Sequence, residues 1–192
     1  MINKIPRDKI LYYKTVIENY HIQKEKFSCL KSIKSVREEA HSFYDKIART
    51  YYCAAKSVSL LDTENKHNQT RDHTLRPSSI LFLPLYLDNY YKKYLDNFEL
   101  LNNIIQCSKI ICKVTKEEHK RITNLKCFTR DIYKVAEVKV FNIDKDCIET
   151  DFYTPGYDYL LPEVQKDIIE IEKDLGYGTN QWKNVNVLGL FL

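Results

Sequence analysis

The sequence predicts a mainly α protein, in which a long antiparallel helical hairpin or bundle carries a small C-terminal α+β appendage. Two observations support this fold class. The four glycines all lie at or after position 156, and glycine is the usual residue for left-handed turns and helix ends. Apolar residues recur every three or four positions through most of the first 112 residues, which is the spacing of a helix face.

Three apolar stripes define the expected helices. The first begins just after Pro6 and contains Ile10, Tyr13, Ile17, Tyr20 and Phe27. The second contains Leu30, Ile33, Val36, Ala40, Phe43, Ile47, Tyr51, Ala54, Val58 and Leu61. The third contains Leu87, Tyr91, Tyr94, Phe98, Leu101, Ile105 and Cys112. Two long helices joined by one loop most simply fold back on each other, so the second and third stripes predict an antiparallel hairpin with the first helix alongside.

Residues 63–79 are poor in apolar side chains and are expected to form the polar loop between those helices. Thr115 and Glu118 have the spacing of a capping box, which predicts a short helix beginning after Thr115. The helical body is therefore expected to span residues 1–133.

The pattern changes near position 134, and residues 134–192 are expected to form a small acidic α+β appendage packed on the body. Residues 135–140 alternate in the period-two manner of a strand, Asp144 to Asp146 supply a turn, and residues 147–153 can return as the partner strand. Pro162 stands where a helix over residues 163–175 would begin, and Gly176 where it would end. The apolar tail, residues 185–192, is expected to add a strand or to dock on a surface.

The composition indicates an ordinary folded domain: 44% of the residues are hydrophobic and 29% are charged. The longest apolar run has eight residues, too few to span a bilayer, and no secretory segment is evident at the N-terminus. The six cysteines are too dilute for a disulfide framework and are read as reduced thiols. These observations favour a cytoplasmic protein, with a nuclear or organellar location left open.

Charge is segregated along the chain. Formal net charge is +5 over residues 1–62, zero over 63–108, +5 over 109–139 and −6 over 140–192. The expected nucleic-acid or partner-binding residues are basic: Lys109, Lys113, Lys116, Lys120, Arg121, Lys126 and Arg130. The first four fall at helical spacing, so on one helix they would line one face and could contact phosphates; the alternative is a solvated helix face. Asp144, Asp146, Glu149 and Asp151 form the expected acidic surface for a basic partner.

Catalytic and metal-binding patterns are weak. Cys107, Cys112, His119 and Cys127 have zinc-binding side chains, but the first two lie five positions apart in what reads as continuous helix, so they would point away from each other. Arg71, Asp72 and His73 are adjacent in the polar loop with no nucleophile nearby in sequence. The chain has no GxGxxG, P-loop, GxSxG or HExxH motif. No catalytic residue, metal or cofactor is therefore assigned.

The function that these observations favour is a non-catalytic docking protein of a larger intracellular assembly, with a ribosome or other ribonucleoprotein as the favoured setting. Its basic stripe would contact RNA and its acidic part a basic protein. Two alternatives stay open: a subunit or adaptor of a purely protein complex assembled through the long helices, and an enzyme such as a nuclease. The sequence does not distinguish among them.

Overall fold

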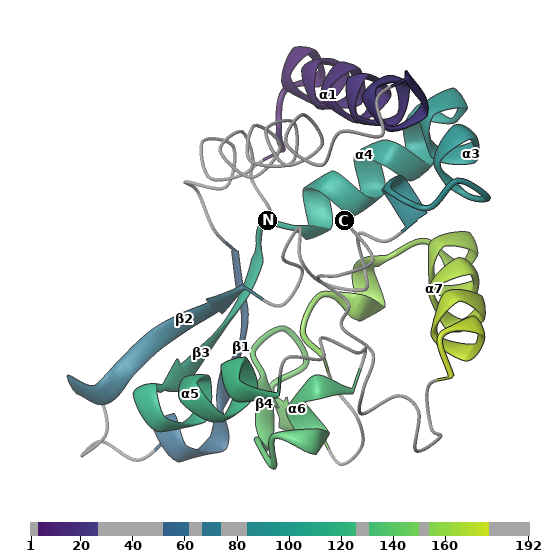
Figure 1. Cartoon of the computed structure of the whole chain (residues 1–192). Helices are drawn as coiled ribbons and strands as arrows, with labels where there is room; N and C mark the ends of the chain where they lie inside the picture. Colours follow the sequence, from purple (N-terminus) through teal and green to yellow (C-terminus); the bar gives the residue numbers. More distant parts are fainter. Residues whose placement is uncertain are drawn as a thin grey trace.

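A computed structural model describes residues 4–26, 52–61, 67–73, 84–125, 131–149 and 154–176. In these residues a five-stranded mixed β-sheet is combined with helices that lie on one of its faces and at one of its ends, so the chain has an α+β fold (Figure 1). The expected mainly α helical hairpin is wrong. Among the helices that the structure describes, none combines the length and the apolar character needed to cross a bilayer.

The sheet is assembled from segments far apart in the chain. Its strands are β1 (Tyr52–Ser57), β2 (Gln69–His73), β3 (Ile110–Thr115), β4 (Val140–Asn142) and β5 (Cys147–Ile148). Their order across the sheet is β2-β3-β1-β4-β5, with β1 and β3 parallel and the other neighbours antiparallel. Because β1 pairs with both β3 and β4, strands from both sides of position 133 share this sheet.

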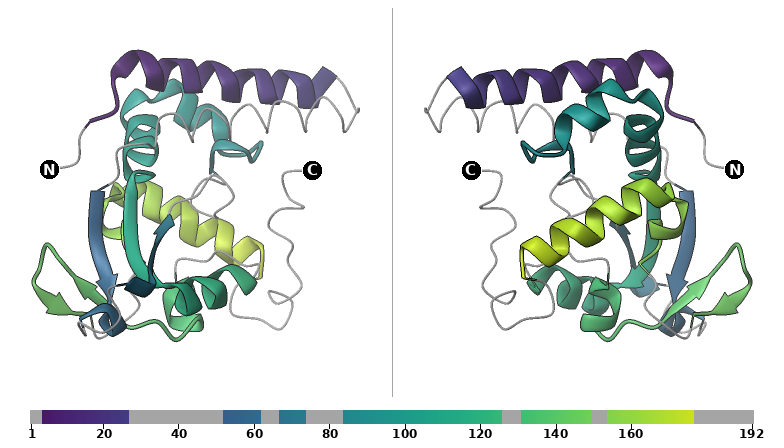
Figure 2. Two further views of the ribbon diagram at one scale, coloured as in Figure 1. Left: turned by 90° about the vertical axis from the view of Figure 1, so that its left-hand side faces the viewer. Right: turned by 90° about the vertical axis from the view of Figure 1, so that its right-hand side faces the viewer.

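The larger hydrophobic cluster lies among the helices at one end of the sheet. It joins α1 (Arg7–Lys26), α3 (Tyr91–Asp96), α4 (Phe98–Cys107) and α7 (Pro162–Asp174), together with the 3-10 turn η4 (Tyr157–Tyr159). Figure 2 shows α1 lying along the outside of α3 and α4, at the end of the molecule opposite to α5 and α6. The predicted face of the first helix is confirmed as far as Tyr20, since Ile10, Tyr13, Ile17 and Tyr20 are all buried; Phe27 lies outside the described residues.

The smaller hydrophobic cluster lies between the sheet and the helices α5 (Lys116–Asn124) and α6 (Ile132–Val135). Ala55 of β1, with Cys112 and Val114 of β3, supplies the strand side of this cluster. Ile122 of α5 and Tyr133 of α6 pack on them. One face of the sheet is therefore covered by α5 and α6.

The third predicted helix is wrong beyond Cys107. Asn97 interrupts it first: its backbone is extended, and its side chain accepts hydrogen bonds from the backbone N–H groups of Glu99 and Leu100, which starts α4 afresh. After a turn at Ser108, residues 110–115 form β3. Five of its six residues are buried, so the strand shows no alternation and reads in sequence like a continuation of the helix.

The second predicted helix is wrong at its C-terminal end, where β1 and the 3-10 turn η1 (Val58–Leu60) stand instead. A register shift between Cys53 and Ala55 lets both Ala54 and Ala55 be buried, and such a β-bulge hides the period-two signal. Residues 30–51 of that stripe, Phe43 among them, lie outside the described residues. The predicted polar loop is also wrong in part, because β2 lies within it.

Three local predictions are confirmed. Thr115 and Glu118 form the capping box that opens α5, with the Thr115 hydroxyl accepting from the Glu118 backbone and the Glu118 carboxylate accepting from the Thr115 backbone. Pro162 opens α7, and Gly176 follows it with a left-handed φ of 79°. The β4–β5 hairpin is present, although it starts later than expected because residues 132–135 form α6. The tail, residues 185–192, lies outside the described residues.

Candidate functional site: a basic face of the sheet

A row of side chains runs straight across the face of the sheet that α5 and α6 leave uncovered. The strand register places Arg71 of β2 opposite Lys113 of β3, Lys113 beside Lys56 of β1, and Lys56 opposite Phe141 of β4. Ile148 of β5 follows Phe141. Residues paired across neighbouring strands point to the same side of a sheet, while successive residues along a strand alternate between sides. All five side chains therefore lie on the same side. The row is three cations, an aromatic ring and an aliphatic side chain.

The neighbouring row points to the opposite side and is covered. Asp72, Cys112, Ala55 and Asn142 are paired across the same four strands and are each 2% exposed or less. In contrast, Arg71 and Ile148 are exposed and Lys113, Lys56 and Phe141 are half-buried. The sheet therefore has one face in the core and one charged face that reaches solvent.

Lys56 and Phe141 are in direct contact on the charged face. The Lys56 ammonium lies 5.2 Å from the centre of the Phe141 ring, within the range of a cation–π interaction. This contact holds a flat apolar ring beside the cations. At the other end of the row, Gln69, Thr70, Arg71 and Lys113 line a cavity of about 430 Å³.

Cys53 lies on β1 close to these lysines. Burial raises the pKa of the Cys53 thiol, while the charges of Lys113 and Lys56 and hydrogen bonds to backbone groups partly oppose that rise. The thiol is therefore a weak nucleophile at neutral pH, because only the thiolate attacks efficiently.

The residues of the predicted basic stripe do not share one helix face. Lys109 lies between α4 and β3 and is only 3% exposed, and its burial lowers the pKa of its ammonium. Lys113 is on the open face of the sheet. Lys116, Lys120 and Arg121 are exposed on α5, which covers the other face. Lys126 and Arg130 lie outside the described residues.

The predicted acidic surface is largely occupied by internal contacts. Both oxygens of Asp144 accept hydrogen bonds from tyrosine hydroxyls, one from Tyr52 and one from Tyr159. These bonds hold the pKa of Asp144 below its usual value. Glu149 accepts from the Asn142 amide at 2.8 Å and from the Lys145 ammonium at 3.0 Å.

Asp146, in the same turn, is exposed and has a left-handed φ of 51°. Asp151 lies outside the described residues. Of the four predicted acidic residues, Asp144 and Glu149 thus form hydrogen bonds within the chain, and Asp144 and Asp146 are exposed to solvent.

The expectation that Cys107 and Cys112 share one continuous helix is wrong, because Cys107 ends α4 and Cys112 lies in β3. The two thiols belong to different hydrophobic clusters. Burial raises the pKa of Cys107 to about 12 and that of Cys112 well above its ordinary value. Within the described residues, no three His, Cys, Asp or Glu side chains converge as metal ligands; Cys127 lies outside those residues.

Asp72, which the sequence placed in a polar loop, is a buried carboxylate. The Tyr133 hydroxyl donates to its Oδ2 at 2.5 Å, and His119 Nε2 lies 3.5 Å from its Oδ1. The histidine side chain is 31% exposed, whereas Asp72 is covered. A partly exposed imidazole oriented by a buried carboxylate is an arrangement that can accept and return a proton. Sequence reasoning missed this pair because its members are 47 positions apart.

Comparison with models of protein families, with curated proteins and with solved structures returns no match for this chain.

Proposed function

We propose that this chain is a non-catalytic RNA-binding docking protein, and that it contacts single-stranded RNA through the open face of its sheet. The observation that carries the proposal is the row of Arg71, Lys113 and Lys56 ending at Phe141. The favoured setting is a ribonucleoprotein assembly in the cytoplasm. The basic residues proposed to contact RNA are Lys56, Arg71 and Lys113 of the sheet, instead of the helical stripe that the sequence predicted.

Electrostatics favours an anionic partner for this face. Neighbouring strands lie about 4.8 Å apart, and Lys113 and Lys56 occupy paired positions on the same face of the sheet. Like charges directly opposite each other on a sheet are destabilising. A bound polyanion relieves that repulsion and releases its own counterions, which is the main source of affinity between proteins and nucleic-acid backbones.

The aromatic ring favours a nucleic acid over a simple polyanion. Bases of single-stranded RNA stack on aromatic side chains, and each such contact is worth about 1–3 kcal/mol. Phe141 is half-buried and lies at the end of the cation row, so one base could stack there while phosphates contact the lysines and Arg71. Double-stranded RNA offers no unstacked base for this ring, which favours single strands.

The test is a salt titration of RNA affinity. A fluorescently labelled oligouridylate of about twelve nucleotides is titrated with the parent chain and with a Lys56→Met, Lys113→Met double variant, at several salt concentrations. Each lysine that neutralises one phosphate of a single strand adds about 0.7 to the slope of log affinity against log salt. The double variant should therefore bind more weakly and show a slope reduced by about 1.4.

A matched control removes two lysines from a different surface. Lys166 and Lys173 lie on α7, and their replacement by methionine changes the net charge by the same amount. This variant should keep the parent's slope. Equal losses in both variants would mean that net charge alone drives binding, and an unchanged affinity in the sheet variant would refute the proposal.

A second candidate function, an enzyme such as a nuclease, is favoured by the pair of Asp72 and His119. In that case the imidazole would act as a general base on a water or ribose hydroxyl. RNA cleavage by the parent that His119→Asn abolishes would support it, whereas intact RNA after long incubation with the parent would favour the non-catalytic proposal.

A further inference from the structure

A cavity of about 650 Å³ lies between the start of α1, α4, the first residue of β1 and η4. Nine described residues line it: Lys4, Ile5, Arg7, Ile10, Tyr52, Phe98, Asn102, Gln106 and Tyr159. Its volume is in the range of small-molecule sites, which bury most of a ligand against apolar walls and orient it with a few polar groups. The lining residues fit that description, since five are aromatic or aliphatic.

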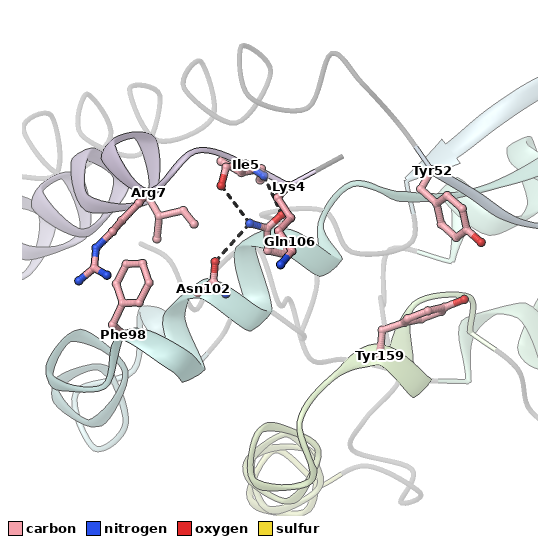
Figure 3. A pocket seen from close by; sticks show the side chains of 9 residues that line it. Lys4, Ile5, Arg7, Tyr52, Phe98, Asn102, Gln106 and Tyr159 are labelled. Carbon is pink, nitrogen blue, oxygen red and sulfur yellow. Dashed lines mark hydrogen bonds between the residues drawn. The ribbon is translucent and has the colours of Figure 1, made fainter. Parts of the chain in front are cut away.

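The two ends of the cavity differ in chemistry. Arg7 and Phe98 lie at one end, with the guanidinium carbon 4.5 Å from the centre of the ring (Figure 3). Tyr52 and Tyr159 lie at the other end, and Asn102 and Gln106 of α4 lie between (Figure 3). The cavity therefore offers a cation beside one ring, and two further rings across from them.

The lining side chains are held in place by contacts of their own. The Gln106 amide donates to the Ile5 carbonyl at 3.1 Å and to Asn102 Oδ1 at 3.2 Å, and its oxygen accepts from the Ile5 backbone at 2.9 Å. These bonds fix the segment that carries Lys4 and Arg7 against α4. The carboxylate of Asp144 holds the tips of Tyr52 and Tyr159. Such an arrangement lowers the entropy lost when a ligand binds.

The charge of the lining selects the sign of the ligand. Among the nine described residues that line the cavity, Lys4 and Arg7 are cations and none carries a carboxylate. Burial is the main cause that lowers the pKa of the Lys109 ammonium, and the nearby positive charge of Lys9 lowers it further. The cations Lys4, Arg7 and Lys9 therefore outnumber the one carboxylate, Asp8, at the start of α1, where the helix dipole is also positive. Asn102 adds an amide N–H that can donate to the edge of a ring.

We infer that this cavity binds a small ligand in which a flat heteroaromatic ring carries a phosphate, a nucleoside monophosphate in chemical class. The ring would lie against Phe98, and the phosphate would contact Arg7, which lies beside that ring, while Lys4 adds positive charge from the side of the cavity where Gln106 lies (Figure 3). A ligand needs both parts to use the whole site, because the aromatic side chains favour a flat ring and the cations favour an anionic group. This site is separate in its residues from the charged face of the sheet.

The experiment measures binding of three probes by calorimetry: adenosine 5′-monophosphate, adenosine and inorganic phosphate. The monophosphate should bind at least about tenfold more tightly than either of the others. Arg7→Met should remove most of that preference over adenosine while leaving adenosine binding. Phe98→Leu, checked by thermal unfolding for an intact fold, should weaken the monophosphate and adenosine alike.

Lys14→Met is the matched control, because Lys14 is a cation of α1 paired with Glu18 and does not line the cavity. This variant should bind the monophosphate like the parent. The inference is overturned if the monophosphate binds no more tightly than adenosine, if none of the probes binds below about 1 mM, or if Lys14→Met weakens binding as much as Arg7→Met. Arg7 is exposed, so its replacement tests the site without disturbing the core.

Discussion

Replacing Tyr133 with phenylalanine removes one oxygen atom from the covered side of the sheet and nothing else. In the parent, that hydroxyl donates to Asp72 Oδ2 at 2.5 Å, and Tyr133 and Asp72 are 1% and 2% exposed. The bond joins α6 to β2 across 61 positions of sequence. The variant therefore tests whether α6 packs on the sheet, which the helical hairpin expected from sequence would not allow.

The magnitude follows from the charge of the acceptor. A hydrogen bond to a charged group contributes about 1.5–3 kcal/mol to stability, and a buried carboxylate that loses a donor keeps its desolvation cost. We expect Tyr133→Phe to lower the free energy of unfolding by about 2 kcal/mol. With a urea m-value of about 2 kcal/mol/M, the midpoint of unfolding should fall by about 1 M.

Urea unfolding followed by circular dichroism measures this directly, and Tyr12→Phe, in a ring that is 49% exposed, is the control. That control should shift the midpoint by less than about 0.25 M. A double-mutant cycle with Asp72→Asn should return a coupling above about 1 kcal/mol. A coupling near zero, or equal losses in Tyr133→Phe and Tyr12→Phe, would refute the packing of α6 on β2.

Three further predictions concern other parts of the chain. Burial alone would raise the pKa of Glu118, but hydrogen bonds from the Thr115 backbone and the Ser59 hydroxyl outweigh it and place that pKa below its usual value. The stability that the Glu118 carboxylate contributes is therefore present above about pH 4.5 and is lost as the pH falls further. Glu118→Gln should accordingly make the loss of stability measured between about pH 5 and pH 3 smaller than in the parent. Ile168→Ala should cost about 2–5 kcal/mol in urea unfolding because Ile168 is fully buried on α7, whereas Ile169→Ala, at a position 43% exposed, should cost far less. Among the four cysteines that the structure describes, exposed Cys147 should react first in thiol labelling resolved by peptide mass spectrometry, and half-buried Cys53 more slowly. Cys107 and Cys112 should react only on unfolding, and early labelling of Cys112 would contradict its burial under α5 and α6.

The parts of the fold that sequence predicted are those set by local chemistry. The capping box of Thr115 and Glu118, the proline that opens α7 and the apolar face of α1 each depend on residues within a few positions of one another. The alternation after position 134 also predicted burial correctly, since Ala136, Val138 and Val140 are covered. The backbone there is helix and turn as far as Glu137, which has a left-handed φ of 54°, so the strand itself begins only at Val140.

The parts that sequence did not predict are set by partners far away in the chain. β3 is a continuous apolar run because it is central and mostly buried, and such a strand has no periodicity to separate it from a helix. β2 is polar, and Asp72 within it is buried next to the Tyr133 hydroxyl and the His119 imidazole, which partly offset the cost of burying a carboxylate.

The candidate site depends on register as much as on composition. Lys113 belonged to the predicted basic stripe, but its neighbours on the charged face, Arg71 and Lys56, are brought there by pairing with β2 and β1. The expectation of a single helical face failed because the chain changes from helix to strand between Cys107 and Ile110. A sequence pattern can assign charge to a segment, but the face that the charge occupies follows from the element that forms.

Photo-crosslinking tests most directly whether RNA contacts the open face of the sheet, as we propose. The chain is irradiated with a 4-thiouridine oligonucleotide at moderate salt, and the crosslinked peptides are identified by mass spectrometry. We predict crosslinks in the β4 peptide that contains Phe141 and in the strands that carry Lys56 and Lys113, with loss of the β4 crosslink in Phe141→Leu. Crosslinks confined to the α5 peptide that carries Lys116 and Lys120, or none above the background of a non-binding protein, would contradict RNA binding at the open face of the sheet.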